Sequence, residues 1–216
     1  MPSKFGTSGI GAIYNGVNNI VAVYKGTELC FSSGDASISL IVPFLERTIS
    51  SVEGFLSNQI TKIGNYAFYQ NPNLSEITIP ESVTSIGDYA FYECSSLKKI
   101  NIPSGVTTIG SYCFTRCIYL PSLVIPEGVT SLNAGTFLGS TISSLTLPST
   151  LTTVGLTAFS GTTIGNLTIL AETPPTCADN NAPTVTGKVY IPKGTLEAYT
   201  TTAAWSYISA DKYIEM

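Results

Sequence analysis

The chain has 216 residues and a formal net charge of −4, with 11% charged and 44% apolar residues. This composition is too hydrophobic for a disordered chain, and it shows no basic surface of the kind that binds nucleic acid or anionic membranes. Histidine, the most common general base and metal ligand, is absent. No apolar run approaches the ~18 residues of a membrane span, so membrane insertion is not predicted. The sequence also contains no pattern that predicts a cofactor or a metal site.

Residues 1–35 are predicted to form a small β-meander. Apolar and polar residues alternate in short runs, and strands are expected near residues 11–14, 19–24 and 28–31. Asn15-Gly16 is a strong two-residue turn signal, and Lys25-Gly26 is a weaker one. The module is either a cap over the first repeat or an attachment domain. Because no charged start precedes an apolar segment here, no secretory signal is expected.

A period of about 23 residues dominates residues 60–170. Five phenylalanines recur at intervals of 23, 23, 23 and 22: Phe68, Phe91, Phe114, Phe137 and Phe159. They lie in the phrases ITKIGNYAF, VTSIGDYAF, VTTIGSYCF, VTSLNAGTF and LTTVGLTAF. Such a period is typical of supersecondary units stacked into a solenoid. We predict a β-rich α/β solenoid over residues 36–170, with a parallel sheet, short helical turns and a cap at each end. Its regular coils are expected over residues 60–170.

Each unit contains a strand phrase that ends in proline in most copies. Residues 36–59 are predicted to be a degenerate first repeat, in which SLIVP corresponds to the later EITIP and KINIP. Alternation with period two points one apolar set inward. These inward pairs are Ile77/Ile79, Ile100/Ile102, Leu123/Ile125, Leu145/Leu147 and Leu167/Ile169. The prolines Pro80, Pro103, Pro126 and Pro148 are expected to end the hydrogen-bonded ladder, because proline has no N–H.

The phrase before each phenylalanine is predicted to form the opposite wall of the coil. Val83, Val106, Val129 and Leu151 begin this wall, and Ile63, Ile86, Ile109, Leu132 and Val154 continue it. A short helical or 3₁₀ turn should follow, with the phenylalanine ring between the two walls. Gly64, Gly87 and Gly110 are expected to permit a tight bend, with positive φ as one possibility.

Residues 171–216 are predicted to be a C-terminal cap. AETPPTC indicates a turn and KVYIPKG a last strand, and Thr195 is a candidate cap for a helix through TLEAYTTTAAW. Four aromatic residues are predicted to cover the open end of the core: Tyr190, Tyr199, Trp205 and Tyr207. A solenoid needs such a cover, because an uncovered coil exposes apolar surface and unpaired backbone groups.

The outward face of the parallel sheet is the predicted binding surface. Its first row is Glu76, Lys99, Ser122, Ser144 and Asn166, and its second row is Thr78, Asn101, Val124, Thr146 and Thr168. Such an array could bind a protein or a glycan through many modest contacts. The alternative is a simply solvated face, since these positions hold no tyrosine, tryptophan or arginine anchor.

Recurring tyrosines and cysteines carry two further hypotheses. Tyr66, Tyr89 and Tyr112 recur beside Tyr69 and Tyr92; they either pack half-buried along the coils or offer rings to sugars. Cys94 and Cys117 hold equivalent positions, which stacking would bring to roughly 5 Å, so they are either free thiols or a disulfide. Cys113 is expected to be a small buried residue.

Catalytic constellations are absent from the sequence. The carboxylates Glu76, Glu81, Asp88, Glu93 and Glu127 are scattered over exposed repeat positions. Glu81 and Glu127 occupy the same slot two units apart, at roughly 10 Å. That separation alone is no glycosidase signature. We therefore predict that the protein is not an enzyme, with a glycan-processing activity as the least favoured alternative.

The unit LxxIxIPxxVTxIGxxAFxxCxx resembles the BspA-like leucine-rich repeat, most clearly in LSEITIPESVTSIGDYAFYECSS and LKKINIPSGVTTIGSYCFTRCIY. The resemblance implies a right-handed curved solenoid, a non-enzymatic role in adhesion and protein binding, and a cell-surface or extracellular location in bacteria. The phrase NNIVAVYKGTELCF resembles short modules of phage and prophage tail proteins. That resemblance implies an alternative, namely a tail-associated structural or receptor-binding protein located in a virion.

Overall fold

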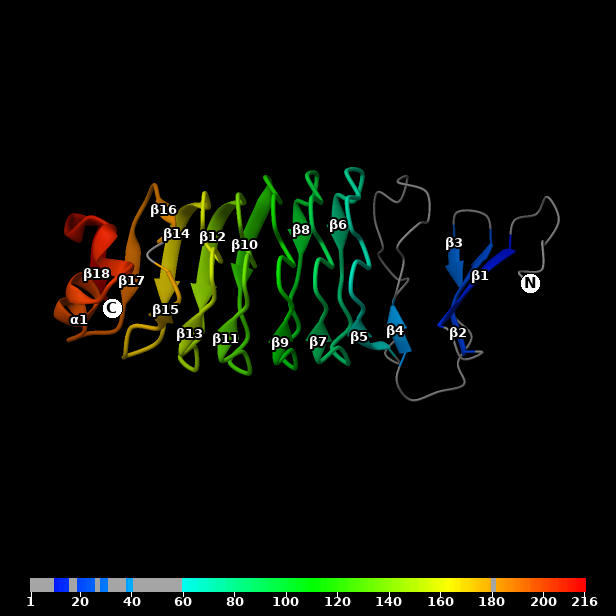
Figure 1. Cartoon of the computed structure of the whole chain (residues 1–216), viewed down its shortest axis with the longest axis horizontal. Helices are drawn as coiled ribbons and strands as arrows, with labels where there is room; N and C mark the ends of the chain where they lie inside the picture. Colours follow the sequence, from blue (N-terminus) through cyan, green and yellow to red (C-terminus); the bar gives the residue numbers. More distant parts are fainter. Residues whose placement is uncertain (1–9, 16–18, 26–27, 31–37, 41–59, 180–181) are drawn as a thin grey trace.

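The computed structural model describes residues 10–15, 19–25, 28–30, 38–40, 60–179 and 182–216. Within residues 60–179 and 182–216 the chain forms a row of coils stacked along one long axis, and the C-terminus lies at one end of that row (Figure 1).

The predicted N-terminal meander is confirmed. Strands β1 (Ile10–Asn15), β2 (Asn19–Lys25) and β3 (Glu28–Cys30) form a three-stranded antiparallel sheet in sequence order. The loops at Gly16 and Gly26 lie outside the described residues. Whether this module is a cap or an attachment domain stays a prediction.

One wall of the solenoid is built from the strand phrases. Its short strands are β6 (Glu76–Ile77), β8 (Lys99–Ile100), β10 (Leu120–Val124), β12 (Thr141–Leu147), β14 (Thr163–Ile169) and β17 (Val189–Ile191). They form a two-stranded sheet, β6-β8, and a larger one, β10-β12-β14-β17-β18, in which β16 (Thr184–Val185) also pairs with β14. Every pairing in this wall is parallel, as predicted.

The opposite wall consists of two shorter parallel sheets. One contains β4 (Ile38–Leu40), β5 (Ile60–Ile63), β7 (Ser85–Ile86) and β9 (Thr108–Ile109). The other contains β11 (Ser131–Leu132), β13 (Thr153–Val154) and β15 (Thr176–Cys177). The position of β4 corrects a prediction, because it pairs with β5 in this wall and not with the strand-phrase wall. The rest of residues 36–59 lies outside the described residues.

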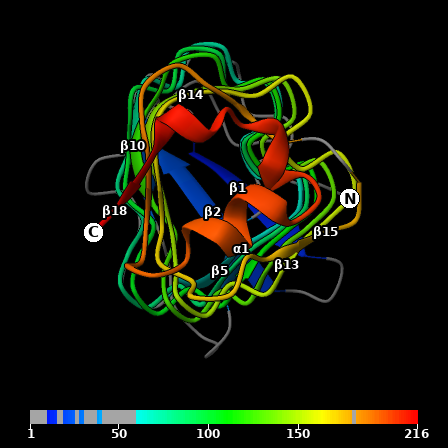
Figure 2. The same cartoon turned by 90° about the vertical axis from the view of Figure 1, so that its left-hand side faces the viewer.

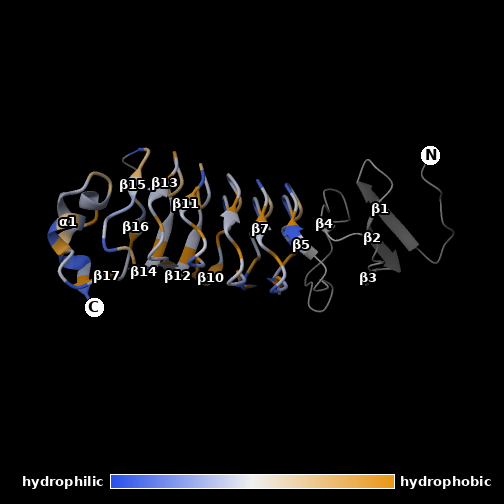
Figure 3. Cartoon of the chain, turned by 90° about the horizontal axis from the view of Figure 1, so that it is seen from below, coloured by the Kyte–Doolittle hydropathy of each residue, from blue (hydrophilic) through white to orange (hydrophobic). Residues whose placement is uncertain are grey.

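The core lies between the two walls, where the predicted inward residues meet. All of them are buried except Ile102, which is partly buried against the core. The five phenylalanines stack one above the other, with ring centroids 5.1–5.9 Å apart and planes within 9° of parallel. Seen along the axis, successive coils superimpose (Figure 2), and apolar segments recur at the same level of each coil (Figure 3). The stack of near-identical units is therefore confirmed.

The turn before each phenylalanine differs from the predicted helical turn. No helix occurs between residues 60 and 179. In its place two tight turns follow each other, closed by hydrogen bonds from Ala67 N to Gly64 O and from Tyr69 N to Tyr66 O. The left-handed residue between them, Tyr66 with φ 60°, prevents a helix from continuing. Alternate N–H groups reach the next coil, as Phe68 N donates to Ala90 O at 2.7 Å.

The role of glycine in these turns is steric and does not depend on positive φ. Gly64, Gly87 and Gly110 do not have positive φ, so this possibility was wrong. A Cβ added at Gly110 would lie 2.3 Å from the backbone nitrogen of Asp88 in the preceding coil. Gly87 and Gly110 are therefore required by the close approach of consecutive coils.

The C-terminal segment first continues the solenoid and then covers it. β15, β16 and β17 pair with strands of the preceding coil, so AETPPTC ends in a strand, and backbone pairing runs past residue 170. KVYIPKG is not the last strand, because β18 (Tyr213–Glu215) pairs with β17. The predicted boundary near residue 170, between the repeat domain and the C-terminal cap, stays a prediction.

A short helix and two 3₁₀ turns complete this end: α1 (Leu196–Thr201), η1 (Trp205–Tyr207) and η2 (Ala210–Lys212). Thr195 precedes α1 but makes no capping hydrogen bond, because its hydroxyl donates to Pro192 O. The helix ends six residues on, which corrects the longer helix that TLEAYTTTAAW suggested.

The residues that close the core are partly those predicted. Tyr199 and Trp205 are fully buried, and they donate to the carbonyls of Ala171 and Pro175, respectively, at 2.7 Å. Tyr207 is 68% exposed, and Tyr190 lies on the outer side of β17 between the buried Val189 and Ile191, so the predicted role of these two as lids was wrong. Tyr213, which was not predicted, is buried there and donates to the carbonyl of Trp205.

Candidate binding surface

The ten predicted binding residues all lie outside the core, on the outer side of the strand-phrase wall. The structure aligns Ser122, Ser144 and Asn166 in one row, and Val124, Thr146 and Thr168 in the next. Glu76 stands beside Lys99 in the two-stranded sheet. Side-chain alternation on short strands is enough to explain this placement. Whether the face binds a partner stays a prediction.

Several polar groups of this face are engaged by neighbouring coils. Lys99 Nζ lies 3.4 Å from Glu76 Oε2. The Asn101 side chain accepts from Ile79 N and donates to Ile79 O. Asn166 Oδ1 accepts a hydrogen bond from Lys188 N. These side chains therefore stabilise the stack as well as facing solvent.

The second row is longer than the repeats alone indicate. Thr168 pairs with Tyr190, and Tyr190 pairs with Ile214, so the row continues onto the C-terminal strands. Tyr190 is half-buried, whereas Ile214 and Val124 are exposed. Sequence reasoning missed Tyr190 and Ile214 as members of the face, because neither belongs to a regular repeat.

A second surface is formed by the turns that precede and follow the phenylalanines. We call its five tyrosines, Tyr66, Tyr69, Tyr89, Tyr92 and Tyr112, the tyrosine ladder. Consecutive rings stack with centroids 5.0 Å apart in both columns. The two columns meet edge to face, as at Tyr66 and Tyr69 with centroids 5.5 Å apart. The prediction that these rings pack along the coils is therefore confirmed, and the faces between stacked rings are not open to sugars.

The ladder ends at Gly135 for a steric reason. A Cβ at Gly135 would lie 2.2 Å from the Tyr112 ring, so the absence of a side chain makes room for that ring. At the other end Tyr66 and Tyr69 are 44% and 37% exposed. Burial raises the pKa of the Tyr89 and Tyr92 hydroxyls above the usual range, so these two side chains are uncharged at neutral pH.

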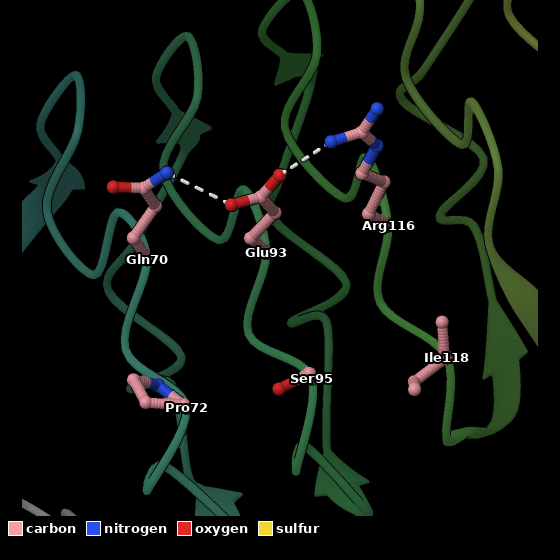
Figure 4. Close-up of a pocket in the computed structure, with 6 residues that line it drawn as sticks. All are labelled: Gln70, Pro72, Glu93, Ser95, Arg116 and Ile118. Carbon is pink, nitrogen blue, oxygen red and sulfur yellow. Dashed lines mark hydrogen bonds and ion pairs between the residues drawn. The ribbon is translucent and has the colours of Figure 1, made fainter.

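A polar row runs beside the ladder, across the same three coils. Glu93 accepts hydrogen bonds from Gln70 Nε2 and Arg116 Nη1, each at 2.8 Å (Figure 4). The hydrogen bond from Arg116 is the main cause that lowers the pKa of Glu93, and the hydrogen bond from Gln70 lowers it further. Figure 4 also shows Pro72, Ser95 and Ile118 in a second row beside these residues. Together the six residues line a shallow groove of about 430 Å³.

The polar row was not predicted as part of a site, although the sequence contained its signal. Gln70, Glu93 and Arg116 are spaced by 23 residues each. In a stack with this period they must become neighbours, and two of them carry opposite charges. Glu93 was considered only as a scattered carboxylate.

The repeat position of Cys94 and Cys117 is a column of hydrogen-bond donors. Both are free thiols, and their Sγ atoms donate to Phe68 O and Phe91 O at 3.1 and 3.0 Å. Ser140 and Thr162 make the equivalent bonds in the next coils. Cys113 is fully buried as expected. Burial raises the pKa of Cys94 to about 12, and it also raises those of Cys113 and Cys117.

The carboxylates are used within the stack. Glu127 accepts from the hydroxyl and the N–H of Ser149, and the side-chain hydrogen bond is the main cause that lowers its pKa. Asp88 accepts from Ser111 N at 2.7 Å. Among the residues that the structure describes, no three His, Cys, Asp or Glu residues are grouped so that they could hold a metal ion. Within the same ranges, no helix is long and apolar enough to cross a membrane.

Known proteins share this architecture. The family model described as the BspA type leucine rich repeat region, in six copies, matches residues 44–173. No curated protein is similar enough to match. A solved leucine-rich repeat protein from Bacteroides ovatus is 18% identical, with a TM-score of 0.50 over 88% of this chain and 71% of that chain. At this identity the likeness shows a shared fold alone.

Two other solved structures are more distant. A leucine-rich cell surface protein from Faecalibacterium prausnitzii is 19% identical, with a TM-score of 0.48 over 89% of this chain and 71% of that chain. The leucine-rich repeat protein of T. pallidum is 22% identical, with a TM-score of 0.42 over 62% of this chain. The chain spans 58% of the length of that protein.

The matches indicate no enzyme family, and leucine-rich-repeat proteins are generally non-enzymatic binding modules. The repeat model covers more than half of the chain, and the described coils have the parallel, stacked build that it requires. The chain therefore belongs to the BspA-type leucine-rich repeat family.

Proposed function

We propose that the protein is a non-enzymatic recognition or adhesion module that binds a protein or a glycan through a repeat-built surface. The observation that carries the proposal is the register of its outward side chains. In the described coils, equivalent residues stand side by side on strands joined by hydrogen bonds.

A surface whose side chains are already held in place loses little conformational freedom when a partner binds. Binding normally has to offset the loss of side-chain and loop freedom at the interface. Here the positions are fixed by the stack before any partner arrives, so many modest contacts can add up. The ten outward residues of the strand-phrase wall are candidate contacts, and Tyr190 extends their second row with an aromatic side chain.

We also propose a cell-surface or extracellular location, on the resemblance of the repeats to the BspA-like family. None of the matches reported above is a phage protein, so the phage-tail alternative rests on the resemblance of the phrase NNIVAVYKGTELCF alone.

Binding arrays test the function with the full chain. The intact protein should retain at least one ligand on a protein or glycan array. The double variant Val124→Lys/Thr168→Lys changes two outward residues of one row and should weaken a ligand held by that face by roughly tenfold or more. Leu156→Ala, an exposed residue away from that face, is the matched control. Folded protein that retains no ligand on either array would contradict the proposal.

A further inference from the structure

The turn surface differs between the two halves of the solenoid. Each described coil has two left-handed positions there. In the first three coils they are occupied by six non-glycine residues with φ between 52° and 60°: Tyr66, Tyr89, Tyr112, Gln70, Glu93 and Arg116. In the next two coils Gly135, Gly139 and Gly161 take three of the four such positions, and Thr157, with φ 55° and a smaller side chain, takes the fourth. Left-handed backbone costs free energy for L side chains and none for glycine. Such strain is typical of functional sites, so the large side chains of the first half call for a role.

The surface formed by these side chains can donate hydrogen bonds through the tyrosine hydroxyls, which also accept them, and through Arg116, which only donates. Stacking covers the ring faces between rungs, while Tyr66 and Tyr69 remain 44% and 37% exposed. Ring edges are the electropositive part of an aromatic ring. Arg116 adds a guanidinium whose side chain is 64% exposed.

The carboxylate at this surface is already occupied. Glu93 accepts from Gln70 and Arg116. It also balances the charge of Arg116, so the ion pair has no net charge. A fitting partner is therefore uncharged and rich in hydrogen-bond acceptors.

A proline-rich segment has these properties. In the polyproline II conformation its carbonyl groups make no internal hydrogen bonds, and proline has no N–H to donate. One turn of that helix takes three residues and about 9 Å. Each step of the tyrosine ladder is 5.0 Å, so two steps, from Tyr66 to Tyr112, match one turn closely. The adjoining groove contains Pro72 and Ile118, which can contact proline rings.

We infer that the tyrosine ladder, with Arg116 and the adjoining groove, binds an extended proline-rich segment of a partner protein. The segment lies along the solenoid axis, accepts hydrogen bonds from the tyrosine hydroxyls and from Arg116, and places proline rings against the groove. Aromatic-lined grooves recognise such segments in other folds. The inference rests on the proposed recognition function and assigns it a second surface and a partner chemistry.

The test measures binding of a labelled oligoproline peptide of about ten residues. Full-length protein should bind it in roughly the micromolar to millimolar range. A peptide with glycine at every third position should bind roughly tenfold more weakly. The triple variant Tyr66→Phe/Tyr89→Phe/Tyr112→Phe keeps the stacked rings and removes three hydroxyls, so it should unfold at the same denaturant concentration and bind roughly tenfold more weakly or worse.

Two further variants sharpen the result. Arg116→Gln should weaken peptide binding, whereas Leu156→Ala, two coils beyond Arg116, should leave it unchanged. Unaltered binding by the triple phenylalanine variant would overturn the inference. So would an intact protein that ignores proline-rich peptides but binds a glycan or another protein on the arrays, and in that case the proposed recognition function would stand.

Discussion

At the scale of single residues, the turn surface combines two opposite demands on the backbone. Tyr112 and Arg116 adopt left-handed conformations that favour glycine, with φ of 56° and 55°. Gly110, two residues before Tyr112, has an ordinary φ but no room for a side chain. Strain and close packing therefore act at different positions of the same turn.

At Gly161 the left-handed backbone can be tested without a steric contribution. Its φ is 64°, and a Cβ added there would meet nothing closer than 3.8 Å. We expect Gly161→Ala to lower the free energy of unfolding by about 1 kcal/mol, through the left-handed backbone alone. Gly105→Ala is the control, because Gly105 has neither positive φ nor a contact under 3.6 Å. Urea titrations of both variants measure the difference, and equal stabilities would contradict the explanation.

Single residues also show how far the sequence could predict this region. The spacing of the phenylalanines was enough to place Phe91 over Phe114, because identical units in a stack bring equivalent residues together. Positive φ at Gly110 was expected from glycine's freedom and was wrong. The close approach of Gly110 to Asp88 depends on the distance between coils, which no residue pattern within one repeat contains.

At the scale of elements, two-residue strands are sufficient because each coil is bonded to the next through its turns as well. Tyr66 N, Phe68 N and Gln70 N all donate to the following coil. The wall to which a short strand belongs is harder to predict. SLIVP has the alternation of the strand phrases, but β4 pairs with β5 of the opposite wall. Both walls need the same apolar alternation, so the pattern could not decide between them.

The sequence pattern could place some candidate surface residues and not others. The outward position of Thr146 or Asn166 follows from alternation. Tyr190 and Ile214 join that face only through pairing of nonrepetitive strands. The row of Gln70, Glu93 and Arg116 could have been found from its 23-residue spacing.

The C-terminal cover gives an element-scale prediction. Trp205 is fully buried, and its indole N–H donates to Pro175 O at 2.7 Å. We expect Trp205→Ala to lower the free energy of unfolding by about 3–5 kcal/mol, because it leaves a large cavity and an unpaired carbonyl. Tyr207→Ala changes an exposed aromatic residue two positions away and should cost less than about 0.5 kcal/mol. Chemical denaturation of the two variants compares them, and similar losses would contradict a closing role for Trp205.

At the scale of the whole molecule, the core is a continuous spine in which each coil contacts its neighbours. In such a structure the contributions of equivalent positions to the free energy of unfolding add along the stack. The column of Cys94, Cys117, Ser140 and Thr162 is one example, since each side chain donates to a carbonyl of the preceding coil. Its two thiols and the neighbouring Cys113 are all fully buried.

These thiols make stability depend on pH in alkaline solution. Burial raises the pKa of Cys94 to about 12 in the folded state, whereas an exposed thiol ionises at about 8.5. Below about pH 8 both states keep the proton, and the thiol contributes its full stabilisation. Between the two pKa values the unfolded state loses the proton first. Each such thiol then lowers the free energy of unfolding by about 1.4 kcal/mol per pH unit.

Cys117→Ser separates this effect from packing. Serine at the equivalent position of the next coil, Ser140, makes the same hydrogen bond, so the variant should keep nearly its full stability at about pH 7. As pH rises from about 8 to 10, its stability should fall less steeply than that of the unmodified protein, because one ionisable thiol has been removed. Urea titrations under reducing conditions at several pH values measure both slopes. Parallel slopes would mean that the Cys117 thiol ionises as readily in the folded chain as in the unfolded one, and would contradict the raised pKa that follows from its burial.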